Sequence, residues 1–70
     1  MKDKENARLW LLAKRREKGL TQEQVAEAAG IARSYYTRIE NGDHKVPVET
    51  AKRIAQVLEM DWTLFYEQNA

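Results

Sequence analysis

The stretch TQEQVAEAAGIARSYYTRIENG, which runs from Thr21 to Gly42, constrains the fold more than any other part of the chain. It opens with the spacing of a capping box, because the Thr21 hydroxyl can accept from the backbone N–H of Gln24 while the Gln24 side chain accepts from the N–H of Thr21. A helix is therefore expected to begin at or just after Thr21. Gly30 stands where the left-handed residue that ends a helix is usually glycine, and Ile31 follows as an apolar residue that fits the angle between two helices. The pattern predicts two short helices joined by a tight turn.

The second of these helices, over about 33–41, divides its residues between two faces. At about 100° per residue, Tyr36 and Ile39 point the same way with Glu40 beside them. The opposite face carries two arginines and two hydroxyls with no carboxylate: Arg33, Ser34, Thr37 and Arg38. Arginine can donate two hydrogen bonds to guanine, and serine or threonine can bond a base edge or contact a thymine methyl group. From composition alone, a plain solvated face is the commoner explanation, because exposed arginine is ordinary.

Two helices in this arrangement have the plan of a helix-turn-helix, whose second helix is presented to a major groove. The match to a known family is carried by TQEQVA at 21–26, Gly30, IENG at 39–42, Pro47, the apolar residues Ala51, Ile54, Ala55 and Leu58, and MDWTLFYE at 60–67. On these residues the chain resembles the phage repressor, Cro and Xre group of DNA-binding domains, from the first helix to about Glu67. The resemblance implies an all-α, compact five-helix lambda-repressor-like domain with the helix-turn-helix at helices 2 and 3.

The resemblance also assigns residues to DNA. It implies base contacts at Arg33, Ser34, Thr37 and Arg38, a phosphate contact at Gln22, and a loop from Asn41 to Lys45 that lies along the backbone. His44 in that loop is expected to be solvated or to face a phosphate, and for Tyr35 a phosphate contact and simple exposure at the rim stay equally open. The chain departs from the family at Ala32, where serine or threonine usually caps the helix. The missing cap costs about 1 kcal/mol and leaves the start of this helix open.

A first helix is expected from about residue 4 or 5 to Lys18, ending at Gly19. Leu11 is its best core candidate, with Ala7 one turn earlier, and Arg15 follows on the same face, where a charge is unusual. In the family that the chain resembles, an arginine at this position pairs with the glutamate of the IENG stretch, here Glu40. We therefore predict a partly buried Arg15–Glu40 salt bridge. The alternative is an exposed pair worth under about 1 kcal/mol.

Both ends of the chain carry more apolar residues than one narrow stripe can bury. They are Leu9, Trp10 and Leu12 near the start, and Trp62, Leu64, Phe65 and Tyr66 after Asp61, an expected N-cap of a fifth short helix. Leu64 and Phe65 are expected to close the core. The remainder can pack together within one chain or form an isologous two-fold interface. The resemblance implies a homodimer through the C-terminal helix, which makes Trp10, Trp62, Phe65 and Tyr66 its candidate interface residues.

Bulk properties limit the remaining options. A chain of 70 residues makes one domain, 1–70, in which we expect 1–4 and 68–70 to be mobile. No cysteine is present, the start MKDKENAR is charged, and no apolar run approaches ~18 residues. We therefore expect a soluble, cytoplasmic protein with no membrane partner. The net charge is only +1, but a basic cluster at 14–18 together with Arg33, Arg38 and Lys45 predicts a basic face on the helix-turn-helix side.

The sequence offers no constellation for catalysis. Its single histidine, His44, has no cysteine or second histidine as a metal partner, and its three glycines match no phosphate-binding loop. We therefore expect no enzyme activity, no metal, no cofactor and no small-molecule ligand. Together with the outward face of the second helix, the family resemblance implies a sequence-specific regulator of transcription, a repressor, which binds double-stranded DNA at a palindromic operator. The alternative is a protein-interaction module of the same fold, antitoxin-like or an adaptor, that uses the apolar Trp10 and Trp62 surface.

Overall fold

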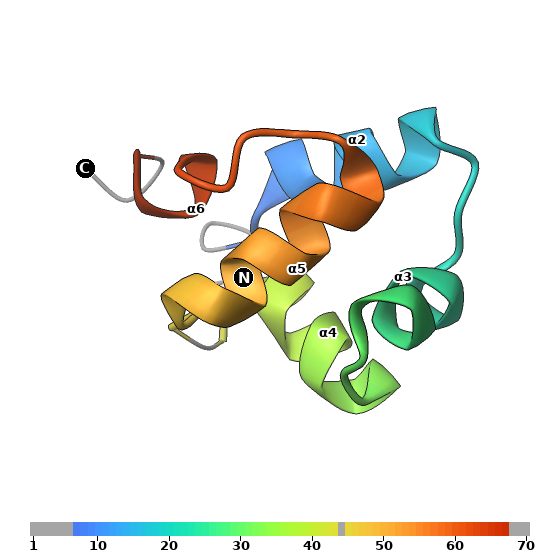
Figure 1. The fold of residues 1–70 in the computed structure, drawn as a ribbon. Helices are drawn as coiled ribbons and strands as arrows, with labels where there is room; N and C mark the ends of the chain where they lie inside the picture. The colour runs from blue at the N-terminus through green and yellow to red at the C-terminus, as the bar shows by residue number, and fades with distance from the viewer. Residues whose placement is uncertain (1–6, 44, 68–70) are drawn as a thin grey trace.

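The structure, a computed structural model, describes residues 7–43 and 45–67. Over these residues the chain forms five helices and no strand, and Figure 1 shows their arrangement. They are α2 (Leu9–Glu17), α3 (Gln22–Ala29), α4 (Arg33–Asn41), α5 (Val48–Leu58) and α6 (Leu64–Glu67). This confirms the all-α, five-helix prediction. The expected mobility of 1–4 and 68–70 concerns segments outside the described residues, and so does the expected placement of His44.

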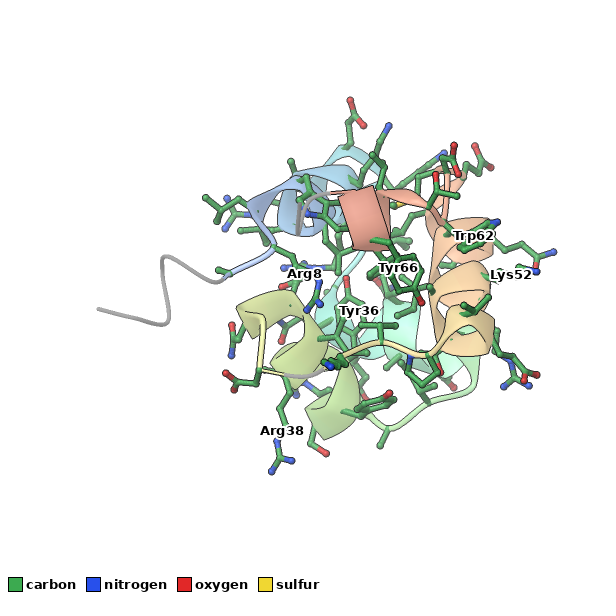
Figure 2. The ribbon with its side chains drawn as sticks, turned by 90° about the vertical axis from the view of Figure 1, so that its left-hand side faces the viewer. Arg8, Tyr36, Arg38, Lys52, Trp62 and Tyr66 are labelled. Atoms are coloured by element: carbon green, nitrogen blue, oxygen red, sulfur yellow. The ribbon has the colours of Figure 1, made fainter. Side chains whose placement is uncertain are left out.

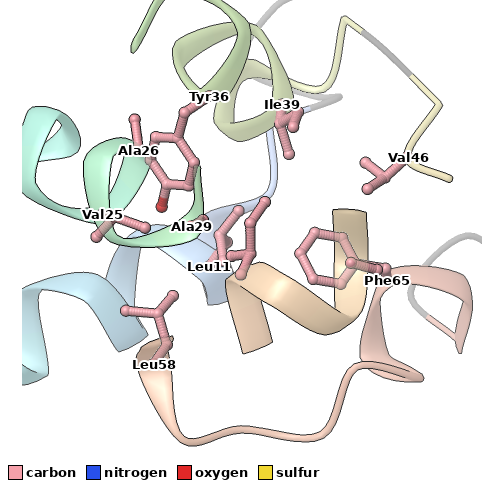
Figure 3. Close-up of a cluster of buried hydrophobic side chains, with 11 residues drawn as sticks. Leu11, Val25, Ala26, Ala29, Tyr36, Ile39, Val46, Leu58 and Phe65 are labelled. Carbon is pink, nitrogen blue, oxygen red and sulfur yellow. The ribbon is translucent and has the colours of Figure 1, made fainter. Parts of the chain in front are cut away.

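The hydrophobic core lies where α3 packs against α4 and α5, and where α2 and α6 close over them (Figure 3). Leu11 is the buried residue of α2, and Phe65 closes the core from α6. The small residues Ala26 and Ala29 of α3 and Ala51 and Ala55 of α5 are all buried. Such small side chains allow helices to approach closely. The remaining buried apolar residues are Val25, Tyr36, Ile39, Val46, Ile54 and Leu58.

The first described helix begins later than the sequence predicted. α2 starts at Leu9. Ala7 and Arg8, which the prediction placed inside the helix, are not helical, so the prediction is wrong at Ala7 and Arg8. The reason is a competing backbone contact. The N–H of Arg8 donates to the carbonyl oxygen of Glu40 at 2.8 Å, which holds this segment against the end of α4 instead of in a helix.

The C-terminal third differs in detail from the prediction. Pro47 is the N-cap of α5, one residue earlier than the first-turn position expected for it. α6 begins at Leu64, so Asp61, the expected N-cap, lies three residues before the helix. Its carboxylate accepts from the backbone N–H and the hydroxyl of Thr63, at 3.0 and 2.8 Å, within the turn that precedes the helix. Leu64 is only half-buried, whereas Phe65 is 1% exposed.

The aromatic residues of the two ends pack within one chain. The rings of Trp10 and Phe65 meet edge to face with their centroids 4.9 Å apart, and those of Trp62 and Tyr66 do so at 6.0 Å. Because Phe65 is buried in the core of the single chain, its assignment to a dimer interface was wrong. Trp10 and Trp62 are partly buried, and Tyr66 is 39% exposed.

Among the described helices, none combines the length and the apolar character that a membrane crossing would need.

Candidate nucleic-acid interface

The turn between α3 and α4 is built by local interactions at both of its ends. The Thr21 hydroxyl accepts from the N–H of Gln24 at 3.1 Å, and the Gln24 side chain accepts from the N–H of Thr21 at 2.9 Å, so the capping box is present. Gly30 ends α3 in the left-handed region with φ 75°, a conformation in which other residues are strained. α4 begins at Arg33 after Ala32, which has extended N-cap geometry and makes no side-chain cap.

The inner face of α4 is anchored by a buried carboxylate. Glu40 is 6% exposed, and its oxygens accept from Arg15 Nε at 2.7 Å, Arg15 Nη2 at 3.3 Å, the Tyr36 hydroxyl at 2.8 Å and Gln22 Nε2 at 2.8 Å. The Arg15–Glu40 pair is thus present and mostly buried, with side chains 13% and 6% exposed. Burial alone would raise the pKa of Glu40, but the hydrogen bonds from Arg15, Gln22 and Tyr36 outweigh it and hold that pKa below its ordinary value.

The C-terminal end of α4 is held by Arg8, a residue that the sequence analysis did not single out. Besides its backbone bond to Glu40, Arg8 donates from Nη1 to the carbonyl oxygen of Ile39 at 2.6 Å, and its guanidinium lies 5.9 Å from the centroid of the Phe65 ring. Figure 2 shows Arg8 directed inward between α4 and α6. Burial lowers the pKa of Arg8. The sequence could not predict this contact, because no periodic pattern distinguishes an arginine before an apolar run from an ordinary charged residue near the end of a chain.

The outward face of α4 has the composition that the helical period predicted. Arg33, Ser34 and Arg38 are exposed, and Figure 2 shows Arg38 pointing away from the body of the protein. Thr37 is half-buried, and its hydroxyl donates to Gln22 Oε1 at 3.0 Å. The fold therefore joins two of the predicted DNA-binding residues to each other. Of the other candidates, Tyr35 is half-buried against the core, and Asn41 and Lys45 are exposed.

The basic cluster at the end of α2 does not lie on this face. Figures 1 and 2 place α2 at the top of the molecule and α4 below it, and Figure 2 shows Arg38 directed downward, away from α2. Three of the cluster's side chains also face carboxylates: Lys14 lies 3.5 Å from Glu17, Lys18 lies 2.5 Å from Glu59, and Arg15 binds Glu40. The predicted basic face beside the helix-turn-helix is therefore smaller than the sequence suggested.

Within residues 7–43 and 45–67, no group of three or more histidine, cysteine or acidic side chains is placed to hold a metal ion. The geometry of this region is instead that of a helix presented to solvent by a turn and a buried anchor.

Comparison with known proteins agrees with this geometry. The chain is 55% identical over 60 residues to the uncharacterized HTH-type transcriptional regulator YqaF of Bacillus subtilis (strain 168), an alignment that covers 86% of this chain and 79% of that protein. It is 42% identical over 48 residues to the ImmF control region 10 kDa protein of Bacillus phage phi105, with 69% and 53% covered. It is 43% identical over 44 residues to the uncharacterized HTH-type transcriptional regulator y4dJ of Sinorhizobium fredii (strain NBRC 101917 / NGR234), with 63% and 57% covered.

The model of the helix-turn-helix family matches residues 11–65, which include α3, the turn and α4 in full and most of the other described helices. The residues that make the capping box, the left-handed glycine and the buried glutamate all fall within this match. The chain therefore belongs to the helix-turn-helix family of Xre and Cro type, a family of DNA-binding, non-enzymatic regulators of transcription.

Proposed function

We propose that this protein binds double-stranded DNA in a sequence-specific way and reads the major groove with α4. The observation that carries the proposal is the division of charge on that helix. Its single carboxylate, Glu40, is buried and paired, while Arg33 and Arg38 stand exposed on the outward face. Base edges in the major groove present acceptors that guanidinium groups match, and a carboxylate on this face would repel the phosphates beside them.

The proposed roles differ between the helix and its surroundings. Arg33, Ser34, Thr37 and Arg38 contact bases, whereas Gln22, Tyr35, Asn41, His44 and Lys45 contact phosphates. Gln22 remains suited to a phosphate although its amide is engaged, because Nε2 carries two hydrogens and only one of them is donated to Glu40. The phosphate contacts fix the position of the domain on the duplex, and the base contacts discriminate among sequences.

We further propose a repressor that works as a homodimer on a palindromic operator. The similarity to a protein of a phage control region supports the repressor role. Half-sites one helical turn apart, about 34 Å, would place two copies of α4 in successive major grooves. Tyr66 with the partly buried Trp10 and Trp62 remains the proposed interface, without Phe65. A regulator of this kind acts where the DNA is, which places it in the cytoplasm.

Selection of bound sites from a pool of random duplexes, followed by binding titrations over a range of salt, tests the proposal. We expect Arg38→Ala to weaken binding to the selected site by ~1 to 3 kcal/mol and to relax preference at one position in each half-site. Lys45→Ala is the matched control, because it also removes one exposed positive charge. It should weaken selected and scrambled sites alike and reduce the slope of log affinity against log salt by about 1. Equal losses on both kinds of DNA for Arg38→Ala would reject Arg38 as a base reader.

The alternative is a protein-interaction module that uses the surface around Trp10 and Trp62, which is also the surface proposed for the homodimer. Trp10 lies against Phe65, and Trp62 is covered by Tyr66 on one side and by Lys52, whose Nζ lies 5.1 Å from the ring centroid. The large hydrophobic side chains that stay exposed among the described residues are Leu9, Val48 and Tyr66. Retention on random duplex DNA at low salt, with elution as salt rises, distinguishes the two functions. An interaction module would pass through without retention.

A further inference from the structure

A chain of hydrogen bonds leads from the buried carboxylate of Glu40 to the outward face of α4. Gln22 Nε2 donates to Glu40 Oε1 at 2.8 Å, and the Thr37 hydroxyl donates to Gln22 Oε1 at 3.0 Å. Glu40 is buried, whereas Gln22 and Thr37 are half-buried. The chain therefore begins in the interior and ends at a side chain on the proposed reading surface.

The direction of every bond in this chain is set by the carboxylate. An ionised carboxylate can only accept, so the side of the Gln22 amide that faces Glu40 must be its NH2 group. The reversed amide would set a carbonyl oxygen against a carboxylate oxygen and leave a half-buried acceptor without a donor. With the NH2 group committed to Glu40, the amide oxygen faces Thr37, and the hydroxyl of Thr37 must donate to it.

Glu40 is held in its ionised form, so it cannot reverse the direction of these hydrogen bonds. Its second oxygen accepts from Arg15 Nε at 2.7 Å and from the Tyr36 hydroxyl at 2.8 Å, and these donors keep it ionised. The Arg15 guanidinium carries no acceptor, and it is also fixed by donation from Nη1 to the carbonyl oxygen of Leu20 at 2.9 Å. The polarity at the surface is thus imposed from the interior by a fixed ion pair.

We propose that Thr37 reads DNA only as a hydrogen-bond acceptor and therefore selects an exocyclic amino group in the major groove, N6 of adenine or N4 of cytosine. Its one proton is held by Gln22, and the lone pairs left on its oxygen match only donors. For the same reason its hydroxyl does not bind a phosphate, which offers only acceptors. This inference rests on the proposed function, and it assigns one residue of that reading face a single chemical preference.

The test combines protein variants with atom-level changes in the DNA. Sites selected by the wild type and by Thr37→Val, which keeps the branched shape without the hydroxyl, identify the base pair whose preference depends on that hydroxyl. In one duplex, this pair lacks the exocyclic amino group, because purine replaces adenine or 2-pyrimidinone replaces cytosine. A second duplex loses the N7 acceptor of the purine, by a 7-deazapurine. Thr37→Ser is the matched control, because it keeps the hydroxyl and loses the methyl group.

Loss of the amino group should weaken binding of the wild type and of Thr37→Ser by about 2- to 10-fold, the value of one neutral hydrogen bond, and leave Thr37→Val unaffected. Loss of N7 should affect all three proteins equally. The proposal is overturned if the N7 change is the one coupled to the hydroxyl, or if Thr37→Val alters no base preference. Absence of any site selection by the wild type would instead reject the proposed function, and this inference with it.

Discussion

The two ends of α4 are held in opposite ways. At the C-terminal end, Gly42 takes the left-handed conformation with φ 82°, Arg8 bonds the carbonyl oxygens of Ile39 and Glu40, and the Glu40 carboxylate is tied to α2 and α3. At the N-terminal end, Ala32 supplies no side-chain cap, and the first turn contains no acidic residue. Arg33 there places a positive charge at the end of a helix where negative charge is favourable.

This difference separates two tasks of a reading helix. The buried bonds at the C-terminal end fix the position of the helix on the domain and the hydrogen-bond polarity of Thr37. At the N-terminal end, Arg33 and Ser34 are exposed on a first turn that has no side-chain cap. We infer that the orientation of α4 is set by the protein, whereas the first turn can adjust to the DNA. Substitutions at each end test this inference separately.

The largest expected effect follows from Glu40→Gln. The change keeps the shape of the side chain and removes the charge, which strands the Arg15 guanidinium with a weaker acceptor in a mostly buried position. Breaking a buried pair in this way should lower the free energy of unfolding by about 3 kcal/mol. Chemical denaturation at pH 7 measures it. Glu27→Gln is the control, because Glu27 is an exposed carboxylate on α3 and the change in net charge is the same. Similar small losses in both variants would mean that the Glu40 anchor contributes little.

The same pair predicts a dependence on pH. The pKa of Glu40 in the folded protein lies below the ordinary value of 4.5, so its contribution to stability is complete above about pH 4.5 and disappears as the pH falls through the lower, folded pKa. Denaturation curves between pH 7 and pH 3 should therefore show a smaller acid-induced loss of stability for Glu40→Gln than for the wild type. A variant that loses stability in acid as steeply as the wild type would show that other carboxylates dominate.

Arg8→Met gives the next largest effect at the same end of the helix. Methionine keeps the length of the apolar stem but cannot donate to the carbonyl oxygen of Ile39 or lie as a cation beside Phe65. A hydrogen bond from a charged donor is worth ~1.5 to 3 kcal/mol, and the release of a half-buried guanidinium from its desolvation offsets part of that. We expect a loss of about 1 to 2 kcal/mol in the free energy of unfolding. Arg16→Met, at an exposed position of α2, should cost less than about 0.5 kcal/mol.

Arg8 also marks the limit of what the sequence could predict. Some features depend only on neighbours within a few residues, and the spacing of residues in the sequence was enough to predict them. They are the capping box at Thr21, the left-handed glycines and the buried face of α4. The pairing of Arg15 with Glu40 required the family resemblance, because no local pattern relates the two positions. The bonds from Arg8 to Ile39 and from Thr37 to Gln22 join segments 31 and 15 residues apart, and they depend on how the helices pack. The assignment of Phe65 to a dimer interface failed because it also depends on how the helices pack. An apolar residue in a short helix fits a core and an interface equally well.

Ala32→Ser should produce the smallest effect and acts on the opposite end of α4. Ala32 already has the extended geometry of an N-cap, with φ −70° and ψ 146°, so a serine hydroxyl there can accept from a backbone N–H of the first turn without moving the backbone. We expect the free energy of unfolding to rise by about 1 kcal/mol and hydrogen exchange to slow in the first turn of α4. Ala28→Ser, at an exposed position inside α3, is the control and should instead cost about 0.5 kcal/mol.

The affinity of Ala32→Ser for the selected site tests whether the missing cap has a part in DNA recognition. If Ala32→Ser stabilises the protein and also lowers this affinity, the uncapped first turn contributes to DNA recognition. If affinity is unchanged, the missing cap has no part in recognition and the contrast between the two ends concerns stability alone.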